Sequence, residues 1–440
     1  MWALLLVALG SAPAQEATQP LDAERRAAME SVLAAAVDLP DARARRKAAL
    51  ELAKGEESLA DWLAVMAGFG GFAPAQPGLL ELQVELPVLG ELESTTLHLF
   101  VPESYDPARP APLVVALHGA GGNGRGIASM WAGPAASAGA LVLAPTEAGP
   151  NEGFSGRPRE REAVLAALRW MRRRYNVDEN RIHLTGVSRG GHLAWELGTR
   201  HSDLWASCAP MIGGPQLALA EGRNTIRLAG NLAGMPVRCL QGMQDSAKLI
   251  LNQELAFERL HAAGASDAQF LRFEELGHDF EFGAVDWAAL LDTVRRDPHA
   301  SRVTRYSVRA EEGRAAWIEL QSLDRAVAAE FRPVVEDAEA WNSWDHERRA
   351  RFIQERADER TARLTVVRTA PGEFHAEGAG VKSFRLLLDA AMYDPEVAVV
   401  LTWQGKPVRK ALRSSKKLLL LDFVERFDRR FLPVAELAVR

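Results

Sequence analysis

The sequence predicts an α/β chain whose main unit is a doubly wound, mostly parallel sheet, preceded by a helical segment and followed by a smaller, mostly β unit. Two observations carry this prediction. Short apolar runs alternate with helical stretches between residues 80 and 297, as strands and crossover helices do in a parallel sheet. One of these runs also leads through a glycine-flanked turn directly into a helical stretch, which indicates a tight strand-to-helix connection.

Length and composition fit a folded chain of more than one domain. The 440 residues exceed what one small core needs, and the 48% hydrophobic and 25% charged residues are ordinary values for globular proteins. The formal net charge of −6 gives no overall positive field to hold polyphosphate or an anionic membrane. We therefore expect no nucleic-acid partner.

The N-terminus has the pattern of an export signal. An apolar run over residues 1–10 is too short to span a bilayer and is followed by Ala12-Pro13-Ala14. We expect residues 1–14 to be a signal peptide and the protein to be periplasmic or secreted. No Lys or Arg precedes the apolar run, so a start site placed too late, or a non-secreted variant, is the alternative. No later run predicts stable membrane insertion.

Residues 15–78 are expected to form a helical segment and a linker. The stretch from Leu21 to Ala67 is rich in Ala, Leu, Glu and Arg with helical spacing, and residues 68–78 are rich in Gly and Pro.

Residues 79–298 are expected to form the α/β unit. The predicted strands are 82–86, 96–101, 113–117, 141–144, 182–185, 205–209, 237–240 and 269–273, and the predicted helices are 126–138, 160–175, 190–199, 247–263 and 285–296. Cys208 and Cys239 fall in neighbouring buried strands, where free core thiols are expected over a disulfide. Arg172 to Arg174 end a predicted helix, where cations suit the helix dipole.

Residues 299–440 are expected to form a mostly β accessory domain. Strand-like stretches at 302–309, 316–320, 364–367, 384–388 and 397–403 surround a charged helical piece at 345–359. No motif in this region specifies chemistry, so we expect residues 15–297 to be active without it.

Ser188 is the predicted nucleophile. It stands in Gly186-Val187-Ser188-Arg189-Gly190, between an apolar strand and a helical run. In a nucleophile elbow the serine occupies a strained turn, and the small residues Gly186 and Gly190 let strand and helix approach. The plain alternative is an ordinary turn serine.

A second glycine-rich loop predicts an oxyanion hole. His118-Gly119-Ala120-Gly121-Gly122 ends the buried strand 113–117. A tetrahedral oxyanion needs two fixed donors, here the amide of Arg189 and that of either Ala120 or Gly121. A phosphate loop is disfavoured because its Lys and Ser/Thr are missing. We expect His118 to brace this loop by hydrogen bonds rather than act as a base.

Chain order selects the acid and the base. Asp245 follows the strand 237–240 and His278 follows the strand 269–273, so both lie at the edge of a parallel sheet where ligands bind. Each could instead be a solvated loop residue. Asp279 is adjacent to His278, but a neighbour rarely reaches back to Nδ1 of the imidazole. No cluster has metal-ligand spacing, so neither a metal nor another cofactor is expected.

The stretch from Tyr175 to Gly191, together with the His118 loop, resembles esterase branches of the α/β-hydrolase superfamily. It looks most like the feruloyl esterase, polyhydroxybutyrate depolymerase and dienelactone hydrolase-like groups, and it is also similar to the catalytic domain of prolyl oligopeptidase-type peptidases. The resemblance covers about residues 80–297. It implies an α/β-hydrolase fold with Ser188, Asp245 and His278 as the triad.

The resemblance implies a serine hydrolase, first a carboxylic ester hydrolase that acts on a small-molecule or polysaccharide-linked ester. A peptidase of prolyl oligopeptidase type is the second candidate, disfavoured because the residues before Leu80 are too few for a large propeller. A third candidate is an inactive hydrolase fold that acts as a binding protein. Arg189 and Asp279 depart from the usual pattern and leave the substrate environment open, and the oligomeric state is also open.

Overall fold

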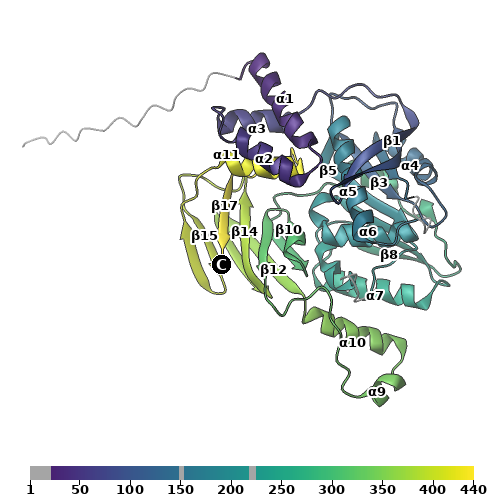
Figure 1. The fold of residues 1–440 in the computed structure, drawn as a ribbon. Coiled ribbons are helices and arrows are strands. Elements are labelled where there is room, and N and C mark those ends of the chain that lie inside the picture. Colours follow the sequence, from purple (N-terminus) through teal and green to yellow (C-terminus); the bar gives the residue numbers. More distant parts are fainter. Residues whose placement is uncertain (1–20, 148–152, 218–223) are drawn as a thin grey trace, which may run out of the picture.

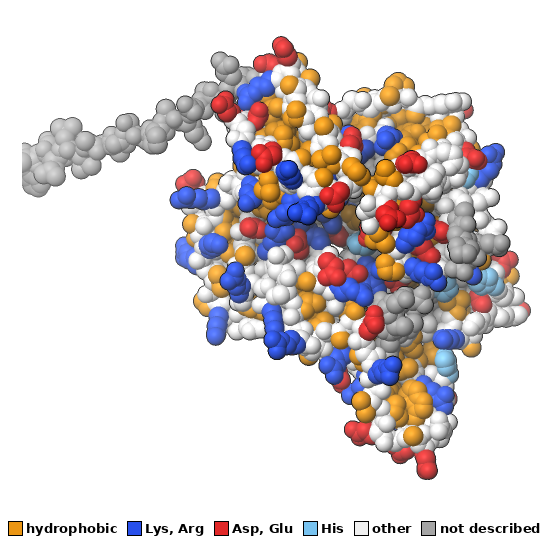
Figure 2. All heavy atoms as spheres, viewed as in Figure 1, with side chains coloured by type: hydrophobic (Ala, Val, Ile, Leu, Met, Phe, Trp, Pro, Cys, Tyr) orange, Lys and Arg blue, Asp and Glu red, His pale blue; other side chains and the backbone are white. Residues whose placement is uncertain are grey.

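The structure is a computed structural model that describes residues 21–147, 153–217 and 224–440. The predicted signal peptide lies outside this part of the chain. Figure 1 shows the large α/β unit beside a smaller β unit, with the first three helices against the latter. On the face in Figure 2, acidic and basic side chains are interspersed, in keeping with the small net charge. Among the described residues, no helix is long and apolar enough to cross a membrane.

The main sheet has eight strands in the order β1-β2-β4-β3-β5-β6-β7-β8. β1 and β2 pair antiparallel, β2 pairs antiparallel with β4, and all later neighbours are parallel. The strand bounds are β1 (Gly78–Val88), β2 (Glu91–Val101), β3 (Ala111–Leu117), β4 (Leu141–Pro145), β5 (Val177–Val187), β6 (Ser207–Met211), β7 (Val237–Gly242) and β8 (Ala268–Phe273). The predicted fold class is confirmed.

Helices cover both faces of this sheet. They are α4 (Gly124–Ala138), α5 (Pro158–Arg174), α6 (Arg189–Arg200), α7 (Ala247–Ala262) and α8 (Trp287–Thr293). One core joins the strands to apolar residues of α5 and α6, and another joins them to residues of α4 and α8. Burial on both faces explains why β3 and β4 are continuous apolar runs. Cys208 and Cys239 are buried and free, as expected.

The first hairpin is longer than the sequence predicted. β1 and β2 pair over their full lengths, and Leu89 and Gly90 between them both have positive φ, 50° and 89°. Such a two-residue turn matches the twist of paired strands. The extra residues were missed because the hairpin extends past the core, where polar side chains such as Glu85 and Glu93 interrupt the apolar signal.

The C-terminal unit consists of two sheets that share one core, which includes Trp317, Phe374 and Phe384. One sheet contains β10 (Arg314–Ala315), β11 (Ile318–Leu323), β14 (Val381–Leu388) and β17 (Ala435–Val439); the other contains β16 (Lys406–Lys410), β15 (Val399–Trp403), β13 (Glu373–Ala379), β12 (Ala362–Ala370) and β9 (Arg302–Ser307). Its helices are α9 (Ala338–Ser343), α10 (His346–Asp358) and α11 (Lys416–Arg426). The predicted charged helix is α10.

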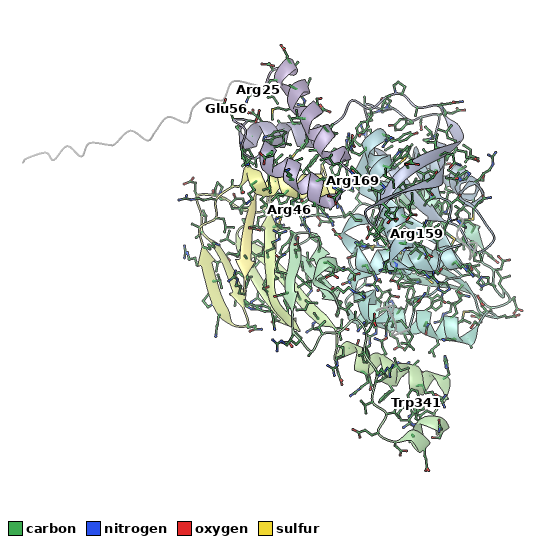
Figure 3. The ribbon with its side chains drawn as sticks, viewed as in Figure 1. Arg25, Arg46, Glu56, Arg159, Arg169 and Trp341 are labelled. Carbon is green, nitrogen blue, oxygen red and sulfur yellow. The ribbon has the colours of Figure 1, made fainter. Side chains whose placement is uncertain are left out.

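Helices α9 and α10 form an arm that leaves the β unit and reaches the α/β unit (Figure 1). Arg351 of α10 donates to both carboxylate oxygens of Glu258 on α7, each at 2.8 Å. Ala350 is buried beside Leu255 of α7. Trp341, labelled in Figure 3, packs at an angle against Trp344 and edge-on against Phe352 farther along the arm.

The first and last parts of the chain build one core. Helices α1 (Ala23–Asp38), α2 (Ala42–Leu52) and α3 (Leu59–Ala67) pack on α11, and the shared core includes Leu33, Trp62 and Phe423. The glycine-rich stretch expected to be a linker takes part in this packing, because Phe69 is only 3% exposed. The burial of Phe69 therefore holds this segment against the helices, although its glycines predicted a linker.

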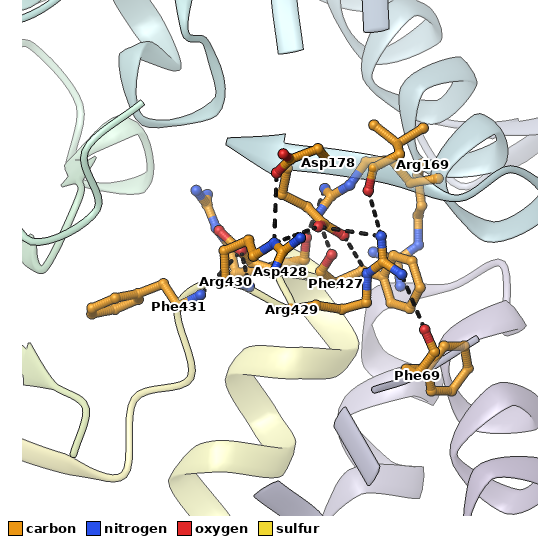
Figure 4. A network of polar contacts seen from close by, with 12 residues as sticks. Phe69, Arg169, Asp178, Phe427, Asp428, Arg429, Arg430 and Phe431 are labelled. Atoms are coloured by element: carbon orange, nitrogen blue, oxygen red, sulfur yellow. Dashed lines mark hydrogen bonds and ion pairs between the residues drawn. The ribbon is translucent and has the colours of Figure 1, made fainter. Parts of the chain in front are cut away.

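Arginine side chains tie the α/β unit to this composite core. Arg429 donates to the Phe69 carbonyl at 3.0 Å, to Asn176 Oδ1 at 3.1 Å and to Glu179 Oε1 at 2.7 Å (Figure 4). Arg169, labelled in Figure 3 on α5, donates to carbonyls at the ends of both α1 and α11.

Arg172 makes the same kind of contact, with the carbonyl of Arg426 at 3.1 Å. Arg172 thus lies in the last turn of its own helix, as predicted, and also contacts the C-terminal end of α11. Its guanidinium supplies hydrogen bonds to the open carbonyl end of another helix.

Candidate active site

Ser188 lies on a strained turn between β5 and α6. Its φ of 54° and ψ of −113° are unusual for a residue with a side chain and occur where surrounding structure holds the backbone in place. A Cβ on Gly190 would lie 2.1 Å from the Leu117 carbonyl oxygen, and one on Gly186 would lie 2.2 Å from the Gly190 carbonyl oxygen. Only glycine fits at either position, so strand and helix meet closely beneath the serine.

The structure brings the three predicted residues together. Ser188 Oγ lies 2.9 Å from Nε2 of His278, and Nδ1 of the same ring lies 2.6 Å from Oδ2 of Asp245. Both distances are those of hydrogen bonds. The loops that carry Asp245 and His278 run against each other, because a Cβ on Gly242 would lie 2.1 Å from the Gly277 carbonyl oxygen. The His278 side chain is 52% exposed, so substrate can reach it from solvent.

The carboxylate that meets His278 is that of Asp245. Its Oδ1 accepts from the Ser246 amide at 2.6 Å, and its Oδ2 also accepts from Gln241 Nε2 at 3.0 Å. Burial by itself would raise the pKa of Asp245, but hydrogen bonds from His278, Ser246 and Gln241 outweigh it and hold the pKa below its ordinary value. Asp279 is exposed, and its Oδ1 accepts from the next amide, that of Phe280, at 2.8 Å.

His118 braces the glycine loop from beneath. Its Nε2 accepts from the Glu147 amide at 3.0 Å, which places the ring proton on Nδ1, 2.8 Å from the Gly119 carbonyl oxygen. The ring packs on Phe154, and burial lowers the pKa of His118. A neutral ring whose accepting nitrogen is already bonded cannot serve as a base here.

The glycine loop lies against the elbow. A Cβ on Gly119 would lie 3.4 Å from Ser188 Cβ. The Gly122 amide donates to the Gly119 carbonyl at 3.2 Å, and Gly121 has a φ of +68°, so residues 119–122 form a β-turn. Such a turn does not use the amides of its two central residues, here Ala120 and Gly121. Arg189 directly follows Ser188 and is the first residue of α6, so its amide lies at the N-terminal end of that helix.

Three polar residues near the triad were missed by the sequence analysis. His192, one turn along α6 from Ser188, has Nδ1 at 2.6 Å from the Gly214 carbonyl oxygen, and burial lowers its pKa. Gln241 and Gln253 form a hydrogen-bonded pair behind Asp245. Amide side chains have no characteristic spacing, and only the position of Gln241 directly before the Asp245 loop could have drawn attention to it.

Two of the cavities lined by described residues lie on either side of the α/β unit, away from the triad. One of 440 Å³ lies between the β1–β2 hairpin and the start of α5, and Gly153 and Phe154, which line it, also contact the glycine loop. Another of 280 Å³ lies between the α/β unit and the C-terminal unit and is lined by residues of both, including Asp203 and Arg314. Neither is lined by Ser188 or His278.

No family model and no curated protein matches the sequence. Solved structures that the chain resembles include a thermostable esterase (25% identity, TM-score 0.36, covering 44% of this chain and 55% of the other). Another is an acylaminoacyl peptidase of Pyrococcus horikoshii (13%, TM-score 0.40, 50% and 42%). A third is a putative dienelactone hydrolase of Klebsiella pneumoniae (21%, TM-score 0.38, 46% and 88%).

The match spans about half or less of the length of the esterase and the peptidase, and such partial likeness does not specify an activity. The fold follows from the chain itself. A mostly parallel eight-stranded sheet carries a serine elbow after β5, an aspartate after β7 and a histidine after β8. The unit from β1 to α8 therefore has the α/β-hydrolase fold.

Proposed function

We propose that this chain is a serine hydrolase that cleaves carboxylic esters through Ser188, His278 and Asp245. The observation that carries the proposal is the hydrogen-bonded series Ser188–His278–Asp245, with distances of 2.9 and 2.6 Å, on a strained elbow. A turn serine without a catalytic role needs neither an imidazole at its hydroxyl nor a carboxylate behind that imidazole.

In this proposal, Ser188 Oγ attacks the ester carbonyl carbon while Nε2 of His278 takes its proton. The ring then gives that proton to the departing alkoxide, and the acyl group stays on Ser188. Water repeats the sequence and releases the acid. Asp245 remains ionised, holds the proton-bearing Nδ1 and balances the charge of the imidazolium.

The oxyanion formed in both steps would accept from the amide of Arg189 and from that of Ala120 or Gly121. Each such donor contributes about 10²- to 10³-fold to kcat in related chemistry. The placement of the glycine loop against Ser188 supports this assignment.

An ester is proposed before a peptide bond as the scissile group. The stretch from Tyr175 to Gly191 and the His118 loop look most like esterase groups, and the segment directly ahead of the sheet forms the helices α1–α3. The proposed substrates are small-molecule or polysaccharide-linked esters.

The test has two arms. A fluorophosphonate probe should label the wild-type protein at Ser188, and Ser188→Ala should abolish labelling and most ester turnover. A panel of nitrophenyl esters, feruloyl and acetylated sugars and aminoacyl-proline amides should then show turnover of esters. Label at a different serine contradicts the triad, cleavage of amides alone assigns a peptidase, and a folded but unlabelled and inactive protein assigns a binding role.

A further inference from the structure

Two fully buried glutamines lie behind the proposed catalytic acid. Gln241, at the end of β7, and Gln253, on α7, are both 0% exposed. Gln241 Nε2 donates to Asp245 Oδ2 at 3.0 Å and to the Gly242 carbonyl at 2.9 Å, and its Oε1 accepts from Gln253 Nε2 at 2.9 Å. These two hydrogen-bonded amides, here called the Gln253–Gln241 relay, therefore end on Asp245 Oδ2, the oxygen that also meets Nδ1 of His278.

The partners of Gln241 permit only one orientation of its amide. Turned by 180°, its Oε1 would face the Asp245 carboxylate and the Gly242 carbonyl, two acceptors, and its NH₂ would face the NH₂ of Gln253. A buried polar group without a matching partner is costly. Gln253 and the two acceptors together thus fix which end of Gln241 faces Asp245.

Gln253 also lies close to the elbow. Its Nε2 is 3.4 Å from the Gly213 carbonyl oxygen, which accepts from Trp195 Nε1 at 3.0 Å. The Gly213 backbone itself lies against Ser188, because a Cβ there would be 2.3 Å from the Ser188 carbonyl oxygen. The relay therefore joins the acid loop to the backbone that supports the nucleophile.

We propose that Gln241, oriented by Gln253, is a positioning residue that fixes the Asp245 carboxylate toward Nδ1 of His278 and sets the pH range in which the triad works. This inference rests on the proposed function. Without the Gln241 donor, the carboxylate gains rotational freedom and becomes a stronger base, so it stabilises the imidazolium more. The acid limb of the kcat/KM profile should then move to higher pH, because more alkaline solution is needed to free Nε2.

Among the described residues, the charged or titratable groups near Asp245 include two histidines and an arginine. His278 contacts Asp245 directly, and His192 on α6 interacts electrostatically with both residues, as well as with Arg189. Burial lowers the pKa of His192 below that of an ordinary imidazole, and its Nδ1 lies 2.6 Å from the Gly214 carbonyl oxygen.

The experiment compares Gln241→Leu and Gln253→Leu with Gln244→Leu, the same change at an exposed position of the Asp245 loop. Gln241→Leu should lower kcat by about 10- to 100-fold with little change in KM. Its acid limb should also move to higher pH. Gln253→Leu should give smaller changes in the same directions, and Gln244→Leu should match the wild type.

Thermal midpoints are measured for every variant. If Gln241→Leu does not fold, Gln241→Glu replaces it, because its carboxylate keeps an acceptor for Gln253. This carboxylate lies beside that of Asp245 and should also move the acid limb to higher pH. A folded Gln241 variant whose kcat and acid limb match those of Gln244→Leu overturns the inference while Ser188 labelling keeps the proposed function intact. A wild type that is not labelled at Ser188 overturns both.

Discussion

Replacing Asp245 with asparagine tests how the acid works, because it removes the charge and one acceptor while it keeps the size of the side chain. Three donors converge on this carboxylate: the Ser246 amide on Oδ1, and Gln241 Nε2 and His278 Nδ1 on Oδ2. Asparagine offers one oxygen. If its NH₂ faces His278, the ring must carry its proton on Nε2 and cannot take the Ser188 proton.

If instead the asparagine oxygen faces His278, its NH₂ meets the Ser246 amide, donor against donor. In either orientation the negative charge that balances the imidazolium is lost. The corresponding change in a serine-protease triad lowers kcat by about 10⁴-fold, or about 5.5 kcal/mol of barrier, and we expect a similar loss here near neutral pH. Asp245 keeps 12% of its side chain exposed, so the fold should survive.

The assay measures kcat, KM and the thermal midpoint with an activated nitrophenyl ester. Asp279→Asn is the matched control, because Asp279 is exposed and accepts only a local hydrogen bond from Phe280 among its described contacts. Its kcat should stay within a few-fold of wild type. A larger loss of kcat in a folded Asp279 variant than in the Asp245 variant would refute the assignment.

Three further outcomes concern the rest of the molecule. A chain ending at residue 297 should be insoluble or inactive, contrary to the expectation from sequence. It lacks Arg429, which pairs with Glu179, and Glu179 is only 1% exposed. A soluble, active truncation contradicts this. Arg429→Met should lower the free energy of unfolding by about 3 kcal/mol, since the buried Glu179 carboxylate loses its nearest partner and keeps only Arg172 and Arg430, 3.7 and 4.0 Å away; denaturant titration that finds under about 1 kcal/mol sinks the idea. The hydrogen bond with Asp389 raises the pKa of His299 from its ordinary 6.5, so its stabilisation is complete below that value and lost as pH rises through the raised pKa. His299→Gln should therefore lower the thermal midpoint more at acid than at alkaline pH, and an equal effect at both would contradict the pairing.

The sequence by itself determined the fold of the α/β unit and the order of the candidate site residues. The signals there are local: a strand, a glycine-flanked serine and a helix follow one another within about twenty residues, and burial on both faces makes strands such as β3 continuous apolar runs. Parallel strands place their carboxyl ends at one edge of the sheet. Chain order was therefore enough to single out Asp245 and His278 before any contact was known.

Tertiary structure decided what the N-terminal helices and the C-terminal unit do. Helix α11 was missed because its four consecutive leucines fit a buried strand as well as a helix. Its apolar partners on α1–α3 lie roughly 350 or more positions earlier in the chain, and Arg429 meets Glu179 across 250 positions. Side-chain periodicity records which face of an element is apolar but not which distant element covers it, so these contacts, and the Gln253–Gln241 relay, are visible only once the chain is folded.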